Sequence, residues 1–546
     1  MLRIVTSPDA PVEAEGSEPA AGGPVSSGGP RHRRPRLSAD QLTILFPALL
    51  AAALCAVELG TRSLWLDEGA TVGIASQHGS ALWQGIAHDG GNMLAYYLLT
   101  HEVITWFGNG AAVIRLPSLI ADAITAAIVA ALALRLFADR RIALTAGVLT
   151  AVSLPLVFWG QNARGYALMV ALGAGSFLAL TAILQTPAGA RPSRGAIAAY
   201  GLTTLAAVYV GFDALLLAAA QLLLVLAAFR NRARVVVGSL AVVAVLCMPL
   251  LVLALNRGSK QLFWVPKLSG TTLGQAAVTL TSAGFSPNFH RTPTTVTTAA
   301  LTGVLLAAAL FAAVRLMRQR SSRQVLGLIV PGSWLMVPAI LALAAGLVGE
   351  PIELSRAAIL LIPALALLLG WGLWHPSLPR GAGLAALAAL VALRVLQLAP
   401  SYGTSPENWR AATSYVLAAT RADPACVAFY PEDGRTPFDY YLGGGRSAAA
   451  ASLTPVLPAT PWSQVRPYVE QYAPLRDPGR IAARCPRLWL ITSHEGWLYG
   501  PVTSQRHYLR YEGVLGELLS VYGAPTLRHF GYSAQVHVWR FTRRTS

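Results

Sequence analysis

The sequence predicts a polytopic α-helical membrane protein that ends in a small α/β domain. Three observations support this fold class. Of the 546 residues, 54% are hydrophobic and 12% are charged, which is about half the charged fraction of a typical soluble domain. Apolar runs of roughly 18–22 residues recur along 41–400, and a helix of that length spans a bilayer. The last part of the chain, 401–546, is polar and carries short strand-like and helix-like patterns.

The apolar runs predict about eleven transmembrane helices, preceded by a disordered cytoplasmic tail at 1–40 that is rich in Gly, Pro, Ser and Ala. The predicted spans are 41–60, 112–136, 142–158, 166–184, 196–212, 214–229, 235–255, 294–314, 325–347, 357–374 and 382–399. Alternate loops between these spans are basic, as expected on the cytoplasmic side of a membrane. We therefore expect a multi-pass protein of the plasma membrane, with its N-terminus in the cytoplasm and its C-terminal domain outside.

The formal net charge of +17 does not indicate a nucleic-acid partner. Most of the excess arginine lies in short loops between apolar runs, where positive charge sets the orientation of membrane helices. A nucleic-acid-binding protein would instead gather its basic residues on one polar face or helix. We therefore exclude nucleic acid as the partner.

The polar region 401–546 is expected to fold outside the cytoplasm as an α/β domain, with strands at 425–430, 487–493 and 534–541 and helices at 407–421, 462–472 and 508–521. Of the four cysteines, Cys55 and Cys247 lie in apolar runs and are expected to be packing residues. Cys426 and Cys485 lie in the polar region, where an oxidising compartment makes them a disulfide candidate. The sequence contains no CxxC motif and no His/Cys cluster typical of a metal site.

Two adjacent carboxylates, Asp67 and Glu68, follow the first predicted span and lie between Trp65 and Gly69. One interpretation is a pair of solvated carboxylates at the membrane interface. The other is a general base whose pKa is tuned by its neighbour.

Three basic residues are predicted on the same outer side as these carboxylates: Arg164, Lys260 and Arg356. Each arginine lies at the end of a span, where it either extends to lipid headgroups or binds a phosphate through its planar guanidinium fork. Lys260 begins the aromatic and basic segment 260–267, which is either an interfacial anchor or a cap over a phosphate.

Several segments resemble the GT-C membrane glycosyltransferases. They are 64–68 (LWLDE), 92–99 (NMLAYYLL), 114–118 (IRLPS), 161–168 (QNARGYAL) and the late arginine Arg356. The most similar group is the protein O-mannosyltransferase and aminoarabinose-transferase branch, glycosyltransferase family 39 and its relatives. The resemblance covers roughly 41–400, and the Ala- and Arg-rich composition is typical of actinobacterial proteins.

The resemblance implies a GT-C fold and an inverting transfer of mannose or arabinofuranose from a polyprenyl-phosphate donor. The acceptor would be a cell-envelope glycan, lipid or protein at the outer membrane face, as in cell wall biogenesis. Asp67 would take the proton of the acceptor hydroxyl, and Glu68 would orient the acceptor or a helper residue. Arg164 and Arg356, with Lys260, would bind the donor phosphate. No cofactor is implied, and a divalent metal is not expected because two arginines can balance the leaving phosphate.

The acceptor or the transferred sugar would contact the first outer loop, where the candidates are His88, Asp89, Asn92, Tyr96 and Tyr97. The alternative is that the loop residues among them, such as His88 and Asp89, are merely solvated.

Four aromatic residues of the C-terminal domain either pack in its core or stack on sugar rings: Trp462, Tyr468, Tyr472 and Trp497.

The chain departs from the family pattern at three places. Residues 92–94 (NML) stand where the family often has a basic residue and two prolines. Residues 209–213 (YVGFD) replace a histidine-containing segment, and Asp122 lies inside the second span. These departures leave the identity of the donor sugar open.

Two other functions remain as alternatives. A lipid flippase or transporter would use ionisable groups near the middle of the membrane, and Asp122 and Asp213 are the candidates for that role. However, the sequence shows no internal repeat. A non-catalytic assembly subunit with a GT-C-like fold would not need Asp67, Arg164 and Arg356, which this chain retains.

Overall fold

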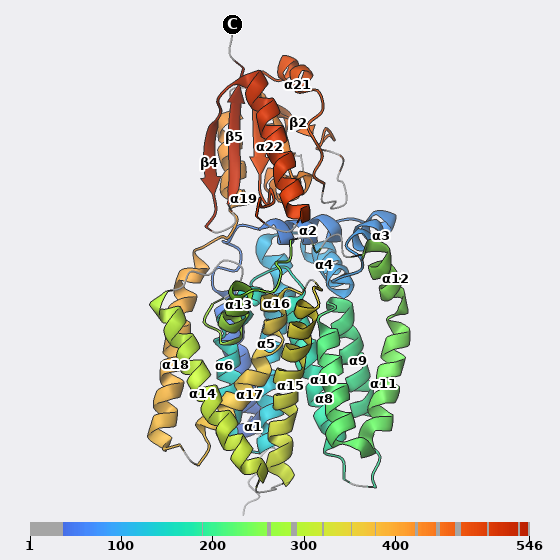
Figure 1. The fold of residues 1–546 in the computed structure, drawn as a ribbon, viewed down its shortest axis with the longest axis vertical. Coiled ribbons are helices and arrows are strands. Elements are labelled where there is room, and N and C mark those ends of the chain that lie inside the picture. Colours follow the sequence, from blue (N-terminus) through green and yellow to red (C-terminus); the bar gives the residue numbers. More distant parts are fainter. Residues whose placement is uncertain are drawn as a thin grey trace, which may run out of the picture. The chain divides into compact units, whose positions relative to one another are not determined.

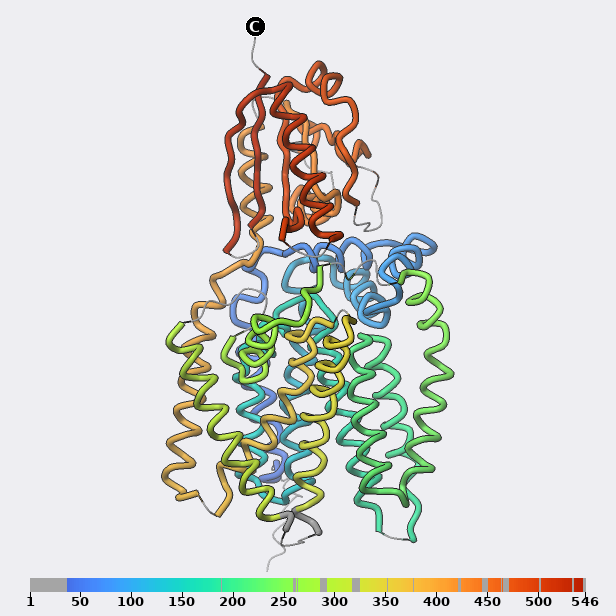
Figure 2. The backbone as a smooth tube through the Cα atoms, viewed as in Figure 1, coloured from blue at the N-terminus to red at the C-terminus, as the bar shows by residue number. Residues whose placement is uncertain are grey.

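The computed structural model describes residues 37–187, 189–258, 262, 264–284, 292–318, 322–350, 352–376, 378–420, 424–443, 448–462, 464, 471–499, 502–532 and 535–543. Ala39–Ser546 forms one compact unit, distinct from Met1–Ser38. Within that unit a helical region is followed by a sheet region (Figures 1 and 2). The predicted disordered tail at 1–40 lies almost wholly outside the described residues.

Six described helices are long and apolar enough to cross a membrane: α1 (Ala39–Ala56), α5 (Ala111–Phe137), α8 (Tyr166–Leu184), α14 (Pro293–Arg318), α15 (Ser322–Leu347) and α18 (Arg380–Tyr402). Two bent pairs raise the number to eight at most. They are α6 (Arg140–Ala151) with α7 (Leu154–Gly160), bent by 59°, and α10 (Ala214–Ala228) with η1 (Arg230–Arg232) and α11 (Ala233–Leu246), bent by 118°. The helical region also contains α9 (Arg194–Val210), α12 (Met248–Arg257), α16 (Leu354–Ile359) and α17 (Ile362–Leu373). The fold class of a polytopic helical membrane protein is confirmed.

The predicted number of eleven spans is not confirmed, although every predicted span coincides with one or two helices. Three predicted spans, 142–158, 235–255 and 357–374, are each divided into two helices. In each case the second helix carries a proline in its first turn: Pro155 in α7, Pro249 in α12 and Pro363 in α17. Proline lacks the N–H that continues a helix and collides with the preceding turn, so the helix breaks there.

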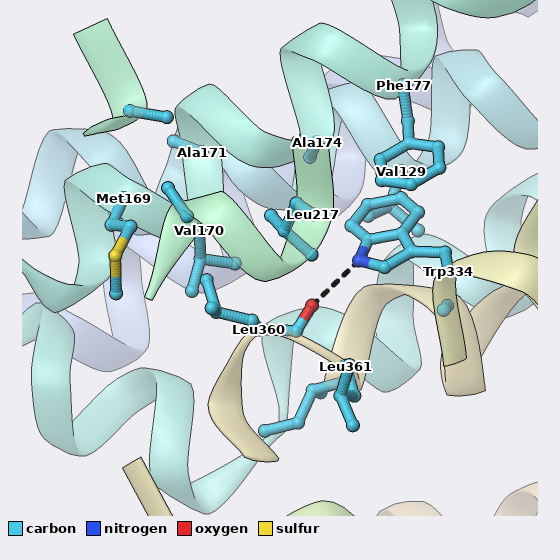
Figure 3. Packing of buried hydrophobic residues seen from close by; sticks show 14 of the residues in the cluster. Val129, Met169, Val170, Ala171, Ala174, Phe177, Leu217, Trp334, Leu360 and Leu361 are labelled. Atoms are coloured by element: carbon cyan, nitrogen blue, oxygen red, sulfur yellow. Dashed lines mark hydrogen bonds between the residues drawn. The ribbon is translucent and has the colours of Figure 1, made fainter. Parts of the chain in front are cut away.

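The break between α16 and α17 is fixed by the core of the helical region. The Leu360 carbonyl lies in this break, where it lacks the partner that a continuous helix provides. The buried Trp334 of α15 donates its indole N–H to that carbonyl at 2.9 Å, and its ring stacks on Phe177 of α8 at 4.1 Å (Figure 3). These contacts hold α16, and with it Arg356, in a defined place against α8 and α15.

Short helices gather at one end of the helical region (Figure 1). They are α2 (Leu66–Ala75), α3 (Gly79–His88), α4 (Leu94–Phe107) and α13 (Gly270–Leu280). The first three make up most of the predicted outer loop 61–110, and α13 lies in the second predicted outer loop, 257–293.

The sheet region contains β1 (Ala425–Tyr430), β2 (Leu453–Leu457), β3 (Arg487–Thr492), β4 (Thr526–Phe530) and β5 (Val536–Thr542), in the order β2-β1-β3-β5-β4. Strands β2, β1 and β3 are parallel, whereas β5 runs antiparallel to β3 and β4. The three predicted strands are confirmed as β1, β3 and β5. The two missed strands are the edges: β2 contains Pro455, and β4 is largely exposed. Edge strands bury little and tolerate proline, so their sequence pattern is weak.

Helices cover both faces of this sheet, which confirms the α/β fold of the region. They are α19 (Trp409–Thr420), α20 (Arg435–Leu442), α21 (Pro478–Arg484) and α22 (Val502–Tyr522), with short turns η3 (Glu432–Gly434) and η4 (Ala448–Ser452). Alternate β1 residues face opposite ways: Val427 and Phe429 pack with α19, whereas Cys426 and Ala428 pack with α22. The predicted helices 407–421 and 508–521 are thereby confirmed.

The predicted helix 462–472 falls mostly outside the described residues, and its described members are not helical. Trp462 is buried between Phe429 and Phe438, and its indole N–H donates to the Leu453 carbonyl at 2.7 Å. Of its two interpretations, packing in the core is the correct one. Tyr468 lies outside the described residues.

Cys426 and Cys485 form a disulfide with a Cα–Cα distance of 5.7 Å, as predicted. It joins β1 to the residue after α21 and lies in the apolar layer between the sheet and α22. Cys55 is free and buried, and Cys247 is free and half-buried. Disulfides persist in oxidising compartments, which suits a domain outside the cytoplasm.

Candidate active site

A cavity of about 860 Å³ lies where the short helices meet the sheet region. Its lining comes from α2, the turn 161–165, α16 and the loop 493–497 of the sheet region. Asp67, Arg164 and Arg356 all line this cavity. Residues from three distant parts of the sequence therefore converge, as the predicted membrane topology required.

Asp67 lies in the first turn of α2, where the exposed N–H groups of a helix favour a carboxylate. Its Oδ2 lies 3.7 Å from Arg164 Nε and 3.6 Å from Arg356 Nη2. Burial opposes ionisation, but Arg164, Arg356 and His494 outweigh it and hold the pKa of the Asp67 carboxyl below its usual value. Among the described residues, no group donates a hydrogen bond to this Oδ2. The carboxylate is therefore ionised and free to accept a proton from a ligand.

Arg164 lies in the turn between α7 and α8. Neighbouring residues of Arg164 hold this turn in place. The Gln161 side chain donates to the Cys55 and Val57 carbonyls at 3.1 and 2.6 Å. Asn162 Oδ1 accepts the Trp65 indole N–H at 2.8 Å. The hydrogen bonds of the Arg164 side chain to described residues are long, at 3.4 Å each, and go to the Asp67 carbonyl and to the hydroxyls of Thr71 and Tyr97. A guanidinium held by weak contacts can turn to a stronger anionic partner.

Arg356 is surrounded by aromatic rings that limit its motion. Its Nη1 donates to the Tyr166 hydroxyl at 2.6 Å. The guanidinium carbon lies 4.6 Å from the Trp264 ring centroid and 5.9 Å from that of Trp159. Such cation–π contacts stabilise the charge without neutralising it, so Arg356 remains a full positive charge facing Asp67.

Glu68 does not line the cavity, so it is not placed to contact the acceptor directly. It is fully buried and forms a bidentate ion pair with Arg115, at 2.8 and 2.7 Å. Its Oε1 also accepts the Ala163 N–H at 2.8 Å. Neighbouring residues on a helix point about 100° apart, so Asp67 and Glu68 face different surroundings. Glu68 is placed to hold α2 against the turn that carries Arg164.

Four of the five candidates of the first outer loop line the cavity: His88, Asp89, Asn92 and Tyr97. Tyr96 does not, and its role in binding the acceptor or the sugar stays a prediction. It is fully buried, and its hydroxyl is 2.8 Å from Ser118 Oγ. Tyr97 donates to Asp89 Oδ2 at 2.8 Å, which joins this group to Arg164. Burial raises the pKa of Asp89 to about 6.

Asp89→Asn is expected to stabilise the protein at neutral pH. Because the pKa of Asp89 is raised above its ordinary 3.8, the folded protein holds this proton more tightly than the unfolded chain does, and stability is lost as the pH rises through about 4–6. The variant should therefore raise the unfolding temperature at about pH 7.5 and have little effect near pH 4, where the wild-type carboxyl is also protonated. Thermal unfolding at both pH values measures this. An equal shift at both would show that ionisation of Asp89 is not the cause.

Sequence reasoning missed several residues that line the cavity. Arg257, at the end of α12, and Glu353, before α16, carry no distinguishing pattern. Glu407 and His494 belong to the sheet region, whose contact with the membrane helices no motif indicates. Asp213 also lines the cavity, although it was considered as a transport residue.

Two further residues from the sequence analysis, Asp122 and Lys260, are not among the described residues that line the cavity. Asp122 does not line the cavity, and it accepts a hydrogen bond from Cys55 Sγ at 3.2 Å. Lys260 lies outside the described residues, so its assignment as a phosphate contact stays a prediction.

Within the described ranges, no group of three or more His, Cys, Asp or Glu side chains is arranged to hold a metal ion. The expectation that the reaction needs no divalent metal stays a prediction.

Neither a family model nor a curated protein sequence matches this chain, but solved structures do. One is ArnT from Cupriavidus metallidurans bound to undecaprenyl phosphate, with 15% identity and a TM-score of 0.51 over 92% of this chain and 98% of that one. Another is the archaeal oligosaccharyltransferase AglB from Archaeoglobus fulgidus in complex with an inhibitory peptide and a dolichol-phosphate. It has 13% identity and a TM-score of 0.52, over 91% of this chain and 74% of that one. At these identities the likeness concerns the fold.

Proposed function

We propose that this chain, which has the GT-C fold of ArnT and AglB, is an inverting membrane glycosyltransferase. The donor is a polyprenyl-phosphate sugar, with mannose or arabinofuranose as the sugar. The acceptor is a hydroxyl of a cell-envelope glycan, lipid or protein. The cavity lies on the extracytoplasmic side of the membrane, with the N-terminus in the cytoplasm.

The observation that carries this proposal is the position of the Asp67 carboxylate between two arginines in a large cavity. A general base must be within reach of the proton that it removes. A lipid phosphate needs cations that stabilise its charge as it leaves. The cavity brings a candidate general base and two cations together. The ligands named for the two similar structures, undecaprenyl phosphate and dolichol-phosphate, support a lipid phosphate as part of the donor.

In the reaction, the acceptor oxygen attacks the anomeric carbon from the face opposite the phosphate. The carbon–oxygen bond to the phosphate breaks, and the configuration at the anomeric carbon inverts. The hydroxyl proton passes to Asp67, and the lipid phosphate leaves with the electron pair of the broken bond, paired with Arg164 and Arg356. No general acid is required, because a phosphate is a good leaving group at neutral pH.

Binding of the donor also prepares the base. Arg164 and Arg356 hold the pKa of Asp67 low, which makes it a poor proton acceptor. A phosphate that pairs with the same arginines reduces their pull on the carboxylate, and the proton affinity of Asp67 rises. Proton removal is thereby favoured when the sugar donor is present.

The remaining residues support this step. Glu68 and Arg115 hold α2 and the Arg164 turn together. His88, Asp89, Asn92 and Tyr97 form a polar wall beside Arg164, where we place the hydroxyls of the transferred sugar or of the acceptor. Of the two transport candidates, Asp213 lines the cavity and Asp122 does not. We prefer transfer to transport because the Asp67 carboxylate lies between two arginines there.

The test is a transfer assay with the full-length protein in lipid nanodiscs. Radiolabelled polyprenyl-phosphate mannose and polyprenyl-phosphate arabinofuranose are supplied separately, and a membrane extract serves as the acceptor. Transfer of label from one donor is the expected result and identifies the sugar. Binding of both donors without transfer or hydrolysis would contradict the proposal and favour the transporter or the assembly subunit.

A further inference from the structure

One loop of the sheet region, 493–499, follows β3 and reaches the cavity. Three of its residues, His494, Gly496 and Trp497, line the cavity on the side of the sheet region, together with Ser504 of α22 and Tyr472. The proposed transfer step uses none of these side chains. Their arrangement therefore needs a separate explanation.

His494 is held in place by Glu407, which precedes α19. The His494 Nε2 lies 2.7 Å from Glu407 Oε1. The other oxygen of this fully buried carboxylate accepts the N–H of Leu66 at 3.0 Å and the indole N–H of Trp409 at 2.6 Å. Leu66 is the first residue of α2 and directly precedes Asp67. Glu407 thus fixes His494 relative to the helix that carries Asp67.

The second ring nitrogen of His494, Nδ1, has no hydrogen-bond partner among the described residues. Three carboxylates from three elements face the ring: Glu407 before α19, Asp433 of η3 and Asp67 of α2. Although burial favours the neutral ring, these charges raise the pKa of His494 to about 9. At neutral pH both ring nitrogens carry protons, so Nδ1 is a free hydrogen-bond donor.

Trp497 is an exposed aromatic side chain on a well-defined backbone. Its side of the cavity is open, with 61% of the residue exposed. The Trp497 N–H donates to Ser504 Oγ at 2.9 Å. Gly496 has a φ of 97°, and a Cβ at this position would collide with the Ser504 carbonyl oxygen. The backbone at Trp497 is therefore held in place although its indole is not covered, so Trp497 is not a core residue.

We propose that the loop 493–499 forms an acceptor subsite for a carbohydrate, in which a sugar ring stacks on Trp497 while His494 Nδ1 donates a hydrogen bond to an acceptor hydroxyl and directs it toward Asp67. This inference rests on the proposed function and extends it, because it selects a glycan among the acceptors. His494 is a positioning residue here, since it orients the acceptor and takes no part in bond making.

A carbohydrate fits this surface better than a peptide does. A sugar ring has an apolar C–H face and a rim of hydroxyls, so it matches an open aromatic ring beside fixed hydrogen-bond donors. The surface also lies beside the proposed base, with Glu407 contacting both His494 and the residue before Asp67. A sugar seated on Trp497 therefore presents a hydroxyl to the carboxylate.

The test measures saccharide binding by saturation-transfer NMR, with the full-length protein in nanodiscs to avoid sugar-based detergents. The probes are soluble trisaccharides of mannose, of arabinofuranose and of glucose, and a threonine-containing peptide. At least one trisaccharide should bind, and Trp497→Ala should weaken that binding by about tenfold, the effect of losing one aromatic contact. Trp83→Ala is the matched control, because Trp83 is a similarly exposed tryptophan of α3 that does not line the cavity.

Two substitutions separate positioning by His494 from a structural role. Glutamine places its amide nitrogen near the position of His494 Nε2, where it can still contact Glu407, but has no nitrogen at the position of Nδ1. Asparagine places its amide nitrogen near the position of Nδ1 and has none at the position of Nε2. His494→Gln should weaken saccharide binding and lower the unfolding temperature less than His494→Asn does, because it loses the charge of the ring but keeps the hydrogen bond to Glu407. His494→Asn should lower the unfolding temperature and retain more of the binding. If binding instead follows the unfolding temperature in both variants, His494 is structural and the inference fails.

Other outcomes also overturn the inference. It fails if no trisaccharide binds, if Trp497→Ala and Trp83→Ala bind equally well, or if Trp497 is needed for the peptide alone. The proposed function fails separately, in the transfer assay, if donors bind but no sugar is transferred. Because saccharide binding does not need the base, Asp67→Asn should abolish transfer and still bind the trisaccharide through Trp497.

Discussion

Asp67→Asn is expected to reduce the turnover of sugar transfer by about 10²–10⁴-fold, the range associated with loss of a general base. Asparagine has nearly the same shape and remains a hydrogen-bond acceptor, but it cannot take the proton of the acceptor hydroxyl. Donor binding should not weaken. The substitution removes the anion that lies 3.7 Å from Arg164 and 3.6 Å from Arg356, so the donor phosphate no longer competes with it for the two arginines.

Two measurements therefore define the result: turnover in the transfer assay, and the dissociation constant of the polyprenyl-phosphate donor. Turnover should collapse while donor affinity stays equal or improves. Glu102→Gln is the control, because it removes a carboxylate from the exposed surface of α4. A variant that transfers sugar at the wild-type rate would exclude Asp67 as the base. A variant that loses donor affinity would show that the carboxylate organises the arginines instead.

The pH dependence of stability follows from the same contacts. The lowered pKa of Asp67 means that its ion pairs stabilise the fold above the ordinary carboxyl pKa of 3.8. This contribution is lost only as the pH falls through the lowered value. At neutral pH the wild-type site is thus ionised, and the comparison with asparagine measures the loss of the charge.

Glu68→Gln is expected to destabilise the protein by about 3–5 kcal/mol, the range for breaking a buried ion pair from one side. Glu68 and Arg115 are 0% and 1% exposed. Arg115 also donates to the Leu59 carbonyl at 2.7 Å, so it joins the turn after α1 to α2. Glutamine would place an N–H₂ group against the guanidinium and leave a buried charge without its counterion. The unfolding temperature or the denaturant midpoint measures the loss.

An exposed pair provides the matched control. Arg140 and Asp40 lie 2.6 Å apart with 62% and 58% of their side chains exposed. Because water screens such pairs, Asp40→Asn should change stability by at most about 1 kcal/mol. Glu68→Gln should also weaken donor binding, since Glu68 accepts the N–H of Ala163, the residue before Arg164. Equal stability of both variants would mean that the buried pair does not hold α2 in place.

Hydropathy and charge patterns alone predict the class of the protein and the outline of its site. Long apolar runs must form helices in a membrane, because every backbone polar group there needs an internal partner. Alternating basic loops assign the ends of those helices to two sides. This reasoning correctly brought Asp67, Arg164 and Arg356 to one end, and the polar region allowed the Cys426–Cys485 disulfide to be predicted.

Which side chains face the cavity depends on how the helices pack in the folded chain. Asp67 and Glu68 are neighbours, as are Tyr96 and Tyr97, and in each pair one residue lines the cavity and the other does not. Consecutive helical residues diverge by about 100°, so the packing of α2 and α4 selects between them. No local pattern contains that information.

The sheet region shows the same limit over a longer distance. Glu407 lies more than 300 residues after Leu66 in the sequence, yet it accepts the Leu66 N–H and holds His494 beside the cavity. The edge strand β2 was missed because it contains Pro455, and β4 because most of its residues are exposed. The sequence determines where the chain is apolar, charged or broken by proline. Distant parts of the chain meet because many weak packing contacts act together. These contacts place the groups that surround Asp67.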